Sequence, residues 1–367
     1  MLLNERVYQV ALTRVPYIGH VHAKALAAHF GSATAIFQAR FAELASIDGI
    51  GTARARAITG FRQFDQCERI CENTARLQAE QLFITSDKYP QQLLNCYDPP
   101  TLLYYKGSID LNHPRMLSVV GTRHHTEYGR QQTESIIGEL RQAGPVIVSG
   151  MAYGIDGLAH RAALRSGLPT LGVLAHGLHT IYPPEHRQLA QEILANGGGF
   201  ITEFPPGSKP DRFNFPIRNR IVAGIAAALL VIETGRKGGS MITAALAGGY
   251  NSQVYALPGR RSDIRSEGCN FLLHNRTAAP FYSVPAFLAD MNWSPAIYSP
   301  AQMNIPFILD EAESVIANLL GHHGALSVDD LYVLSGMPSG AAAGAILSLE
   351  MRNIIRALPG KRYQRCV

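Results

Sequence analysis

Residues 117–150, LSVVGTRHHTEYGRQQTESIIGELRQAGPVIVSG, contain two short apolar runs separated by a helical stretch. LSVVG (117–121) and PVIVSG (145–150) predict buried strands, and residues 128–142 predict the helix that joins them. A strand, a helix and a second strand in this order form a βαβ unit, whose two strands are parallel. The rhythm continues in TLGVLA (170–175), GFITE (199–203), ALLVIE (228–233) and QVYALPG (253–259). We therefore predict an α/β fold with a doubly wound, Rossmann-like parallel sheet that binds ligands at the carboxyl ends of its strands.

Two helical regions flank the predicted sheet. Near the start of the chain, Gly19 and the run Gly49-Ile50-Gly51 each precede a predicted helix. This pattern is typical of helix-hairpin-helix (SAM-like) modules, whose exposed backbone N–H groups hold a phosphate. An αα-hairpin that needs glycine only for its turn fits the same pattern, so contact with DNA stays open.

The end of the chain predicts a winged-helix-like domain. Residues 310–320, 327–334 and 341–352 predict three helices, and a β-hairpin with Pro359-Gly360 at its turn follows. The third helix is almost without basic residues, which favours a protein contact or dimer role over reading of DNA. We divide the chain into a helical domain (1–65), a Rossmann-like domain with its entry segment (66–293), a proline-rich linker (294–306) and the winged-helix-like domain (307–367).

Composition and charge limit the classes of function. The longest apolar run, residues 221–232, is too short for a membrane span, which takes roughly 20 residues. The first ten residues carry charges at Glu5 and Arg6 and no export-signal pattern, so we expect a cytoplasmic protein without membrane contact. The five cysteines lack zinc-ligand spacing, and we expect no metal. Residues 113–276 hold 17 Lys and Arg against 11 Asp and Glu, and 15 of the 17 are arginines, which suits contact with phosphates.

The predicted strands end in loops that suit anions. Gly121-Thr122-Arg123, SGMAYGID (149–156) and TGRKGGS (234–240) combine glycine with donor side chains, and the last loop opens a helix. In FPIRNRIVAGI (215–225), Arg218, Asn219 and Arg220 stand together, and guanidinium groups match phosphate oxygens two at a time. The alternative is that one of these arginines caps or bridges to a neighbouring element. Neither a dinucleotide fingerprint nor a triphosphate-binding loop is present, so we expect no cofactor and an extended polyanion instead.

Candidate catalytic groups are few. Glu203 and Glu233 end predicted strands, where they fit either an acid–base pair or partners of local arginines and helix caps. Asp156 and His160, one helical turn apart, fit internal support of their loop better than a metal site. We expect no catalytic residue.

Seven motifs occur in order along the chain: VVGTR (119–123), SGMAYGIDGLAHRAAL (149–164), TLGVLAHGLHTIYPPEHRQL (170–189), ITEFPPG (201–207), FPIRNRIVAGI (215–225), GGSMITAALA (238–247) and VYALPG (254–259). Together they closely resemble the DNA-processing protein A family (DprA, also called Smf), over about residues 89–271. The resemblance implies a cytoplasmic bacterial protein that binds single-stranded DNA during natural transformation, protects it and loads the RecA recombinase. It also implies a homodimer without catalytic activity.

The resemblance further implies a DNA-binding set, to which the glycine loops add Thr122 and Lys237. In this set Lys209 would contact a phosphate and Phe213 would stack on a base. The full set is Gly121, Thr122, Arg123, Ser149, Gly150, Gly154, Lys209, Phe213, Arg218, Asn219, Arg220, Lys237, Gly239, Ser240 and Thr243.

Two departures from the family pattern stand out. The family's K-S-G-S loop is Lys237-Gly238-Gly239-Ser240 here, which loses one hydroxyl, and residues 275–277 replace a late glycine. The alternative function is a nucleotide-processing enzyme of the lysine-decarboxylase-like phosphoribohydrolase type. Such enzymes carry a PGG-x-GT-x-x-E loop with a catalytic glutamate, whereas this chain has Ala244 and Ala245 where acids would be needed.

Overall fold

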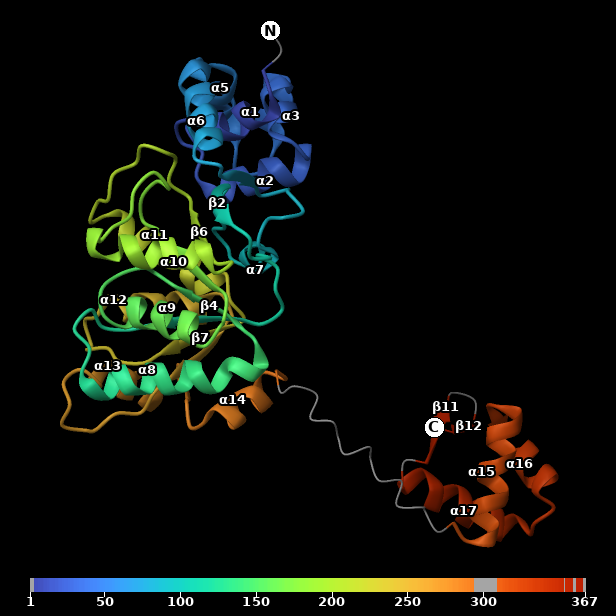
Figure 1. Cartoon of the computed structure of the whole chain (residues 1–367). Coiled ribbons are helices and arrows are strands. Elements are labelled where there is room, and N and C mark those ends of the chain that lie inside the picture. Colours follow the sequence, from blue (N-terminus) through green and yellow to red (C-terminus); the bar gives the residue numbers. More distant parts are fainter. Residues whose placement is uncertain (1–2, 294–308, 353, 359–360, 366–367) are drawn as a thin grey trace. The chain divides into compact units, whose positions relative to one another are not determined.

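The computed structural model describes residues 3–293, 309–352, 354–358 and 361–365 of the 367-residue chain (Figure 1). The chain divides into two compact units, residues 1–295 and 296–367. The predicted linker (294–306) and the predicted turn at residues 359–360 lie outside the described residues. Within the described residues, no helix is long and apolar enough to cross a membrane.

Six helices open the first unit: α1 (Glu5–Leu12), α2 (His20–Phe30), α3 (Ala33–Gln38), α4 (Phe41–Ser46), α5 (Gly51–Thr59) and α6 (Phe64–Arg76). Gly49 and Gly51 have φ of +75° and +61°, which favours glycine in the turn before α5. Arg54 ties this turn to the earlier one, because its side chain donates to the carbonyls of Gly49 and Tyr17. The expected domain boundary at residue 65 falls inside α6, which packs on α1.

A nine-stranded sheet forms the centre of this unit. Its strands are β1 (Glu80–Phe83), β2 (Leu102–Gly107), β3 (Met116–Val120), β4 (Val146–Ser149), β5 (Thr170–Val173), β6 (Gly199–Thr202), β7 (Ala228–Val231), β8 (Gln253–Ala256) and β9 (Ala279–Pro280), in the spatial order β1-β2-β6-β5-β4-β3-β7-β8-β9. Strands β3 to β8 coincide with the six predicted runs and pair in parallel, so the predicted sheet is confirmed. The sequence patterns did not predict β1, β2 and β9, and β2 pairs antiparallel with β6.

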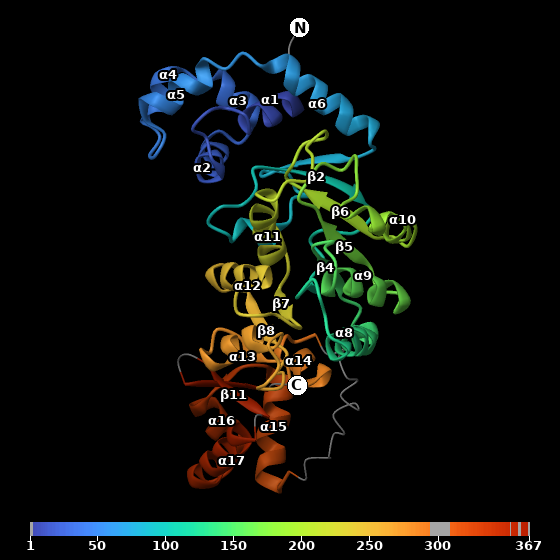
Figure 2. The same ribbon diagram turned by 90° about the vertical axis from the view of Figure 1, so that its left-hand side faces the viewer.

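Helices cover both faces of this sheet (Figure 2). On one face lie α8 (Glu127–Glu139), α9 (Ile155–Arg165) and α10 (Arg187–Ala195), and on the other lie α11 (Asn214–Gly224) and α12 (Gly239–Gly249). Side chains alternate accordingly along β3. Leu117 and Val119 join the core with α8 and α9, whereas Met116 and Val120 join the core with α11 and α12. Shorter segments complete the unit: α7 (Gln91–Leu94), η1 (Leu140–Ala143), η2 (Pro184–His186), α13 (Glu267–His274) and α14 (Val284–Asp290).

The strand order reverses at β3. From β3 the chain adds β4, β5 and β6 on one side, and it then returns to add β7, β8 and β9 on the other. Helices that leave neighbouring strands toward opposite faces open a crevice at such a point. The fold therefore places its ligand site beyond the carboxyl ends of β3, β4 and β7.

The second unit confirms the predicted winged-helix fold. Its helices are α15 (Glu311–His323), α16 (Val328–Ser335) and α17 (Ser339–Met351), and β10 (Leu326–Ser327), β11 (Ile355–Leu358) and β12 (Arg362–Arg365) form an antiparallel sheet. Leu320, Leu331 and Leu349 bring the three helices together in one apolar core. The boundaries of the three helices agree with the predicted ones to within a few residues.

Candidate nucleic-acid interface

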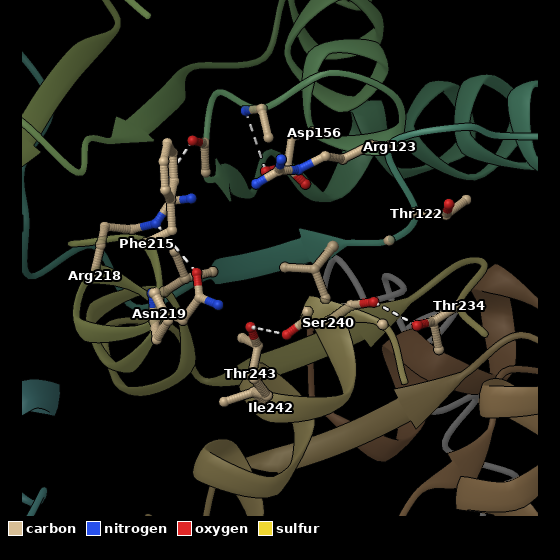
Figure 3. Close-up of a pocket in the computed structure, with 18 of the residues that line it drawn as sticks. Thr122, Arg123, Asp156, Phe215, Arg218, Asn219, Thr234, Ser240, Ile242 and Thr243 are labelled. Atoms are coloured by element: carbon tan, nitrogen blue, oxygen red, sulfur yellow. Dashed lines mark hydrogen bonds between the residues drawn. The ribbon is translucent and has the colours of Figure 1, made fainter. Parts of the chain in front are cut away.

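A cavity of about 670 Å³ lies at the strand-order reversal, beyond the carboxyl ends of β3, β4 and β7 (Figure 3). Arg123 and Asp156 stand on one side of it, and Ser240 and Thr243 of α12 stand on the other. Nine members of the predicted set line this cavity: Gly121, Thr122, Arg123, Gly150, Arg218, Asn219, Gly239, Ser240 and Thr243. Segments separated by more than a hundred residues in the sequence thus converge on one space.

The loop after β3 is fixed by its backbone. The Thr122 N–H donates to the carbonyl of Glu233 (2.7 Å), and the Thr122 carbonyl accepts from the N–H of Ile155 (3.1 Å). Gly154 has a φ of +76°, and a Cβ on it would collide with the Thr122 carbonyl and the backbone of Arg123. Gly154 does not line the cavity, but its lack of a side chain lets this loop approach the start of α9.

Arg123 shares a wall of the cavity with aromatic rings. Its guanidinium carbon lies 5.4 Å from the centroid of the Phe215 ring, and the Tyr182 ring lies 6.0 Å from the same centroid. All three side chains line the cavity. A cation beside aromatic rings offers one contact for a phosphate and another for a base, which is the combination that non-specific single-strand binding uses.

Arg218 is held in the floor of the cavity. Its side chain is 4% exposed, and Nη1 donates to the carbonyls of Gly150 and Val173. Burial lowers the pKa of Arg218 to about 10, while the nearby Asp156 acts in the opposite direction. Burial likewise raises the pKa of Asp156, against the effect of Arg218. Arg218 therefore ties the ends of β4 and β5 together beneath the ligand space.

Arg220 lies outside the cavity. Its guanidinium donates to the Glu203 carboxylate and to the Asp98 carbonyl, and it lies 2.8 Å from Nε2 of His20. Arg220 and Glu203 each have side chains 8% exposed, so this is a buried ion pair. The alternative interpretation of the arginine motif, a bridge to neighbouring elements, describes Arg220. Removing one partner of such a pair leaves an uncompensated buried charge.

The two candidate glutamates have structural partners. Glu203 pairs with Arg220, and Glu233 accepts from the backbone N–H and the hydroxyl of Thr126, the N-cap residue of α8. Both contacts agree with the second interpretation of these residues, as partners of an arginine and of a helix start. His160 is fully buried, and its Nδ1 lies 2.7 Å from Oγ1 of Thr170. Because that hydroxyl donates to the Ile147 carbonyl, it can only accept from His160, so Nδ1 of His160 carries the proton. The imidazole thus links α9 to β5 in the interior of the unit.

The N-terminus of α12 forms the opposite wall. Gly238 is the N-cap residue, and Gly239 and Ser240 begin the helix, whose first N–H groups and dipole favour an anion. Ser240 donates its hydroxyl to Oγ1 of Thr234 (2.7 Å). A Cβ on Gly238 would collide with that same Thr234 hydroxyl. Thr234 thus gives a physical reason for glycine where the family pattern has serine.

Six members of the predicted set do not line the cavity: Ser149, Gly154, Lys209, Phe213, Arg220 and Lys237. The buried Ser149 hydroxyl donates to the Val119 carbonyl (2.6 Å), which is a contact within the sheet. Phe213 is 65% exposed, with the Arg212 guanidinium 4.7 Å from its ring centroid. Lys209 and Lys237 are exposed beside loops that line the cavity. No contact in the structure tests the roles of these two lysines and Phe213, which stay predictions.

Sequence reasoning did not single out Arg212, Phe215 or Tyr182, all of which line the cavity. Phe215 opens the arginine motif itself, and Tyr182 precedes a double proline in the motif TLGVLAHGLHTIYPPEHRQL. An aromatic ring next to a cationic motif was the sequence feature that could have predicted these base-stacking residues. The choice of Phe213 rested on the family resemblance, which implies an apolar ring just before the arginine motif. The sequence does not show which of the two rings turns toward the cavity. Within the described residues, no group of three or more His, Cys, Asp and Glu side chains is arranged to hold a metal ion.

Comparison with known proteins gives matches to three family models. The model of DNA recombination-mediator protein A matches residues 80–292, a helix-hairpin-helix motif matches residues 10–70, and the DprA winged helix domain matches residues 300–361. Protein Smf of Synechocystis is 32% identical over all of both chains. Protein Smf of Escherichia coli is 34% identical over 75% of this chain and 74% of its own.

Two DNA processing proteins A are among the similar solved structures. DNA processing protein A of Streptococcus pneumoniae matches with a TM-score of 0.66 at 29% identity, over 79% of this chain and 99% of its own. DNA processing protein A of Helicobacter pylori, described for its single-stranded DNA binding mode, matches with a TM-score of 0.53 at 30% identity, over 59% of this chain and 96% of its own.

Proposed function

Because this chain belongs to the DNA recombination-mediator protein A family, we propose that it binds single-stranded DNA in the cavity beyond β3, β4 and β7. The observation that carries this proposal is the convergence of a cation, two aromatic rings and a helix N-terminus on one space. The relative from H. pylori, described as a single-stranded DNA binder, supports the same ligand.

Different groups of the cavity bind the phosphates and the bases of the strand. Arg123 and the first N–H groups of α12 face the cavity from opposite sides and hold phosphate oxygens of the strand. Phe215 and Tyr182 offer ring faces on which bases stack, and stacking contributes about 1–3 kcal/mol per base. Since every base has a ring face, binding of this kind is insensitive to sequence.

The cavity selects against duplex DNA for a physical reason. Stacking on Phe215 and Tyr182 needs bases whose faces are free, whereas a duplex presents only base edges in its grooves. The single strand is therefore the form that gains both phosphate and ring contacts.

The wider biological role follows from the family. We propose that the protein acts as a homodimer in the cytoplasm during natural transformation, protects the incoming strand and loads the RecA recombinase onto it. The relatives named as DNA processing proteins support this role.

The phosphoribohydrolase alternative lacks its chemical groups. Ala244 is buried in α12 and Ala245 follows it, where such an enzyme needs an acid. The carboxylates of Glu203 and Glu233 already have partners, since Glu203 pairs with Arg220 and Glu233 accepts from Thr126. We propose that the protein acts by binding and not by catalysis.

The proposal is tested by titrating the full chain against one oligonucleotide sequence in single-stranded and duplex form at several salt concentrations. We expect tighter binding of the single strand, with an affinity that falls as salt rises. A parallel incubation with nucleoside monophosphates, followed by a search for free base, tests the alternative. Equal affinity for both DNA forms, or clear release of free base, would overturn the proposal.

A further inference from the structure

The loop after β8, which we call the β8 loop, adds a second set of cations beside the cavity. Arg260, Arg261 and Arg265 of this loop are exposed, as are Arg236 and Lys237 of the loop of residues 234–240, which we call the glycine loop. We call these five residues the basic rim. The ion pairs found among the described residues involve none of the five, so no carboxylate there forms a salt bridge with them.

Hydrogen bonds fix the β8 loop against the cavity. The side chain of Asn270 accepts from the Gly259 N–H (3.2 Å) and donates to the Gly259 carbonyl (3.1 Å), which locks the start of the loop. Arg265 donates to the carbonyl of His124, a residue that lines the cavity. The loop is thus attached to the same β3 segment that carries Arg123.

The glycine loop is held in a similar way. The guanidinium carbon of Arg236 lies 4.1 Å from the centroid of the Phe271 ring of α13. Residues 236 and 237 stand between Gly235 and Gly238, both of which line the cavity. The basic rim therefore starts at the edge of the cavity and continues away from it over the β8 loop.

Charge balance in this region favours an anion. The β8 loop, the start of α13 and residues 234–240 together contain two carboxylates, Asp263 and Glu267, against the five cations of the basic rim. The Asp263 carboxylate already accepts a hydrogen bond from the backbone N–H of Arg265 (2.9 Å), which stabilises the turn between these two residues. Ile264 stands among the cations and is 74% exposed, which places an apolar contact beside the phosphate contacts.

We propose that the basic rim binds the single strand where it leaves the cavity, as a second stretch of phosphate contacts. This inference rests on the proposed function and deepens it, because it defines the path of the bound strand over the surface, which runs from α12 toward the β8 loop. Strands that only fill the cavity do not reach the basic rim, whereas longer strands do.

The test uses the double variant Arg260→Ala/Arg261→Ala in the full chain, since Arg236 and Arg265 also hold their loops. The matched control is Arg141→Ala/Arg187→Ala, which removes two exposed arginines on η1 and α10, outside the cavity. Binding is measured against salt with single strands of about 6 and about 20 nucleotides, lengths chosen to fall within and beyond a typical binding footprint.

For the long strand we expect the log–log salt slope of the rim variant to shrink by about 1.4, which corresponds to two single-strand phosphate contacts. The short strand should bind the rim variant as it binds the natural protein, and the control should match the natural protein with both strands. If the rim variant and the control have the same salt slope with the long strand, the inference is wrong. The basic rim would then not contact DNA and would suit an acidic protein partner instead. An equal loss for both strand lengths would overturn the inference as well.

The Arg123→Ala variant separates this inference from the proposed function. If Arg123→Ala weakens binding of both strand lengths while the rim variant changes neither, only the basic rim is refuted. If Arg123→Ala also has no effect, the cavity itself is not the binding site.

Discussion

At the scale of single residues, burial separates the arginines that can reach a ligand from those that build the site. Arg218 and Arg220 are 4% and 7% exposed, and both guanidiniums bond to protein groups. Arg123 instead lines the cavity beside Phe215. The sequence shows three neighbouring polar residues in FPIRNR but not which of them face inward, since that depends on the packing of α11.

Replacing Arg123 by alanine should weaken single-strand binding more than Arg141→Ala does. Arg123 stands at the carboxyl end of β3 in the cavity, whereas Arg141 is exposed on η1. We expect the salt slope of Arg123→Ala to fall by about 0.7, the value for one single-strand phosphate contact. Fluorescence anisotropy titrations across salt measure both variants. If the two substitutions have the same effect, the case for a phosphate contact at Arg123 is lost.

The two phenylalanines before the arginine motif should behave differently. Phe215 lines the cavity next to Tyr182, so Phe215→Ala should lower single-strand affinity by about 1–3 kcal/mol with little change of salt slope. Phe213 is 65% exposed and outside the cavity, so Phe213→Ala should cost less and leave the melting temperature unchanged. A larger loss of affinity in Phe213→Ala than in Phe215→Ala would favour Phe213 as the stacking ring, as the sequence predicts.

At the scale of elements, the strands were predictable because their apolar runs are short, separated and rich in β-branched residues. Strands β3 to β8 match six such runs. Strands β1, β2 and β9 escaped prediction for different reasons. Strand β9 has two residues, β1 starts with the charged and polar pair Glu80-Gln81, and β2 follows a double proline that reads as an entry segment. In addition, β1 and β9 are the edge strands of the sheet, and the packing of a strand against its neighbour is not visible in a local pattern.

The loops between elements were predictable where glycine is required by backbone geometry. Gly154→Ala should destabilise the first unit by about 1–3 kcal/mol, because a non-glycine residue at a φ of +76° is strained and its Cβ would collide with the β3 loop. Gly138→Ala on α8 is the control. Its Cβ meets nothing within 4 Å, and alanine in a helix should stabilise by up to about 1 kcal/mol.

Urea denaturation followed by circular dichroism measures both glycine variants. Because the β3 loop carries Arg123, Gly154→Ala should also weaken single-strand binding under conditions where it remains folded. A Gly154→Ala protein as stable as the natural one would show that this loop accommodates a side chain and does not fix Arg123.

At the scale of the whole molecule, the two units contribute differently to the candidate site. The cavity and the basic rim belong entirely to residues 1–295. In the second unit, α17 contains a single charged residue, Glu350, although this helix holds the position that reads DNA in many winged-helix proteins. The sequence predicted this fold because the three helices and the hairpin each have a local sequence pattern. The low charge of the third helix follows directly from its composition.

Removal of residues 296–367 should therefore leave single-strand affinity nearly unchanged, because the cavity and the basic rim lie within residues 1–295. The measurement compares the truncated and full chains in the same salt titration, with circular dichroism as the control for folding. A collapse of affinity in a folded truncated chain would assign DNA contact to the winged-helix unit.

Hydrogen–deuterium exchange of the full chain with and without a single-stranded oligonucleotide locates the bound strand without any substitution. We predict slower exchange at residues 121–124, 150–152, 212–219 and 234–243, the segments that line the cavity. Amides of α15 to α17 should exchange at the same rate in both samples. Protection confined to the hairpins before α2 and α5 or to α17, with the cavity segments unchanged, would show that the strand does not bind in the cavity.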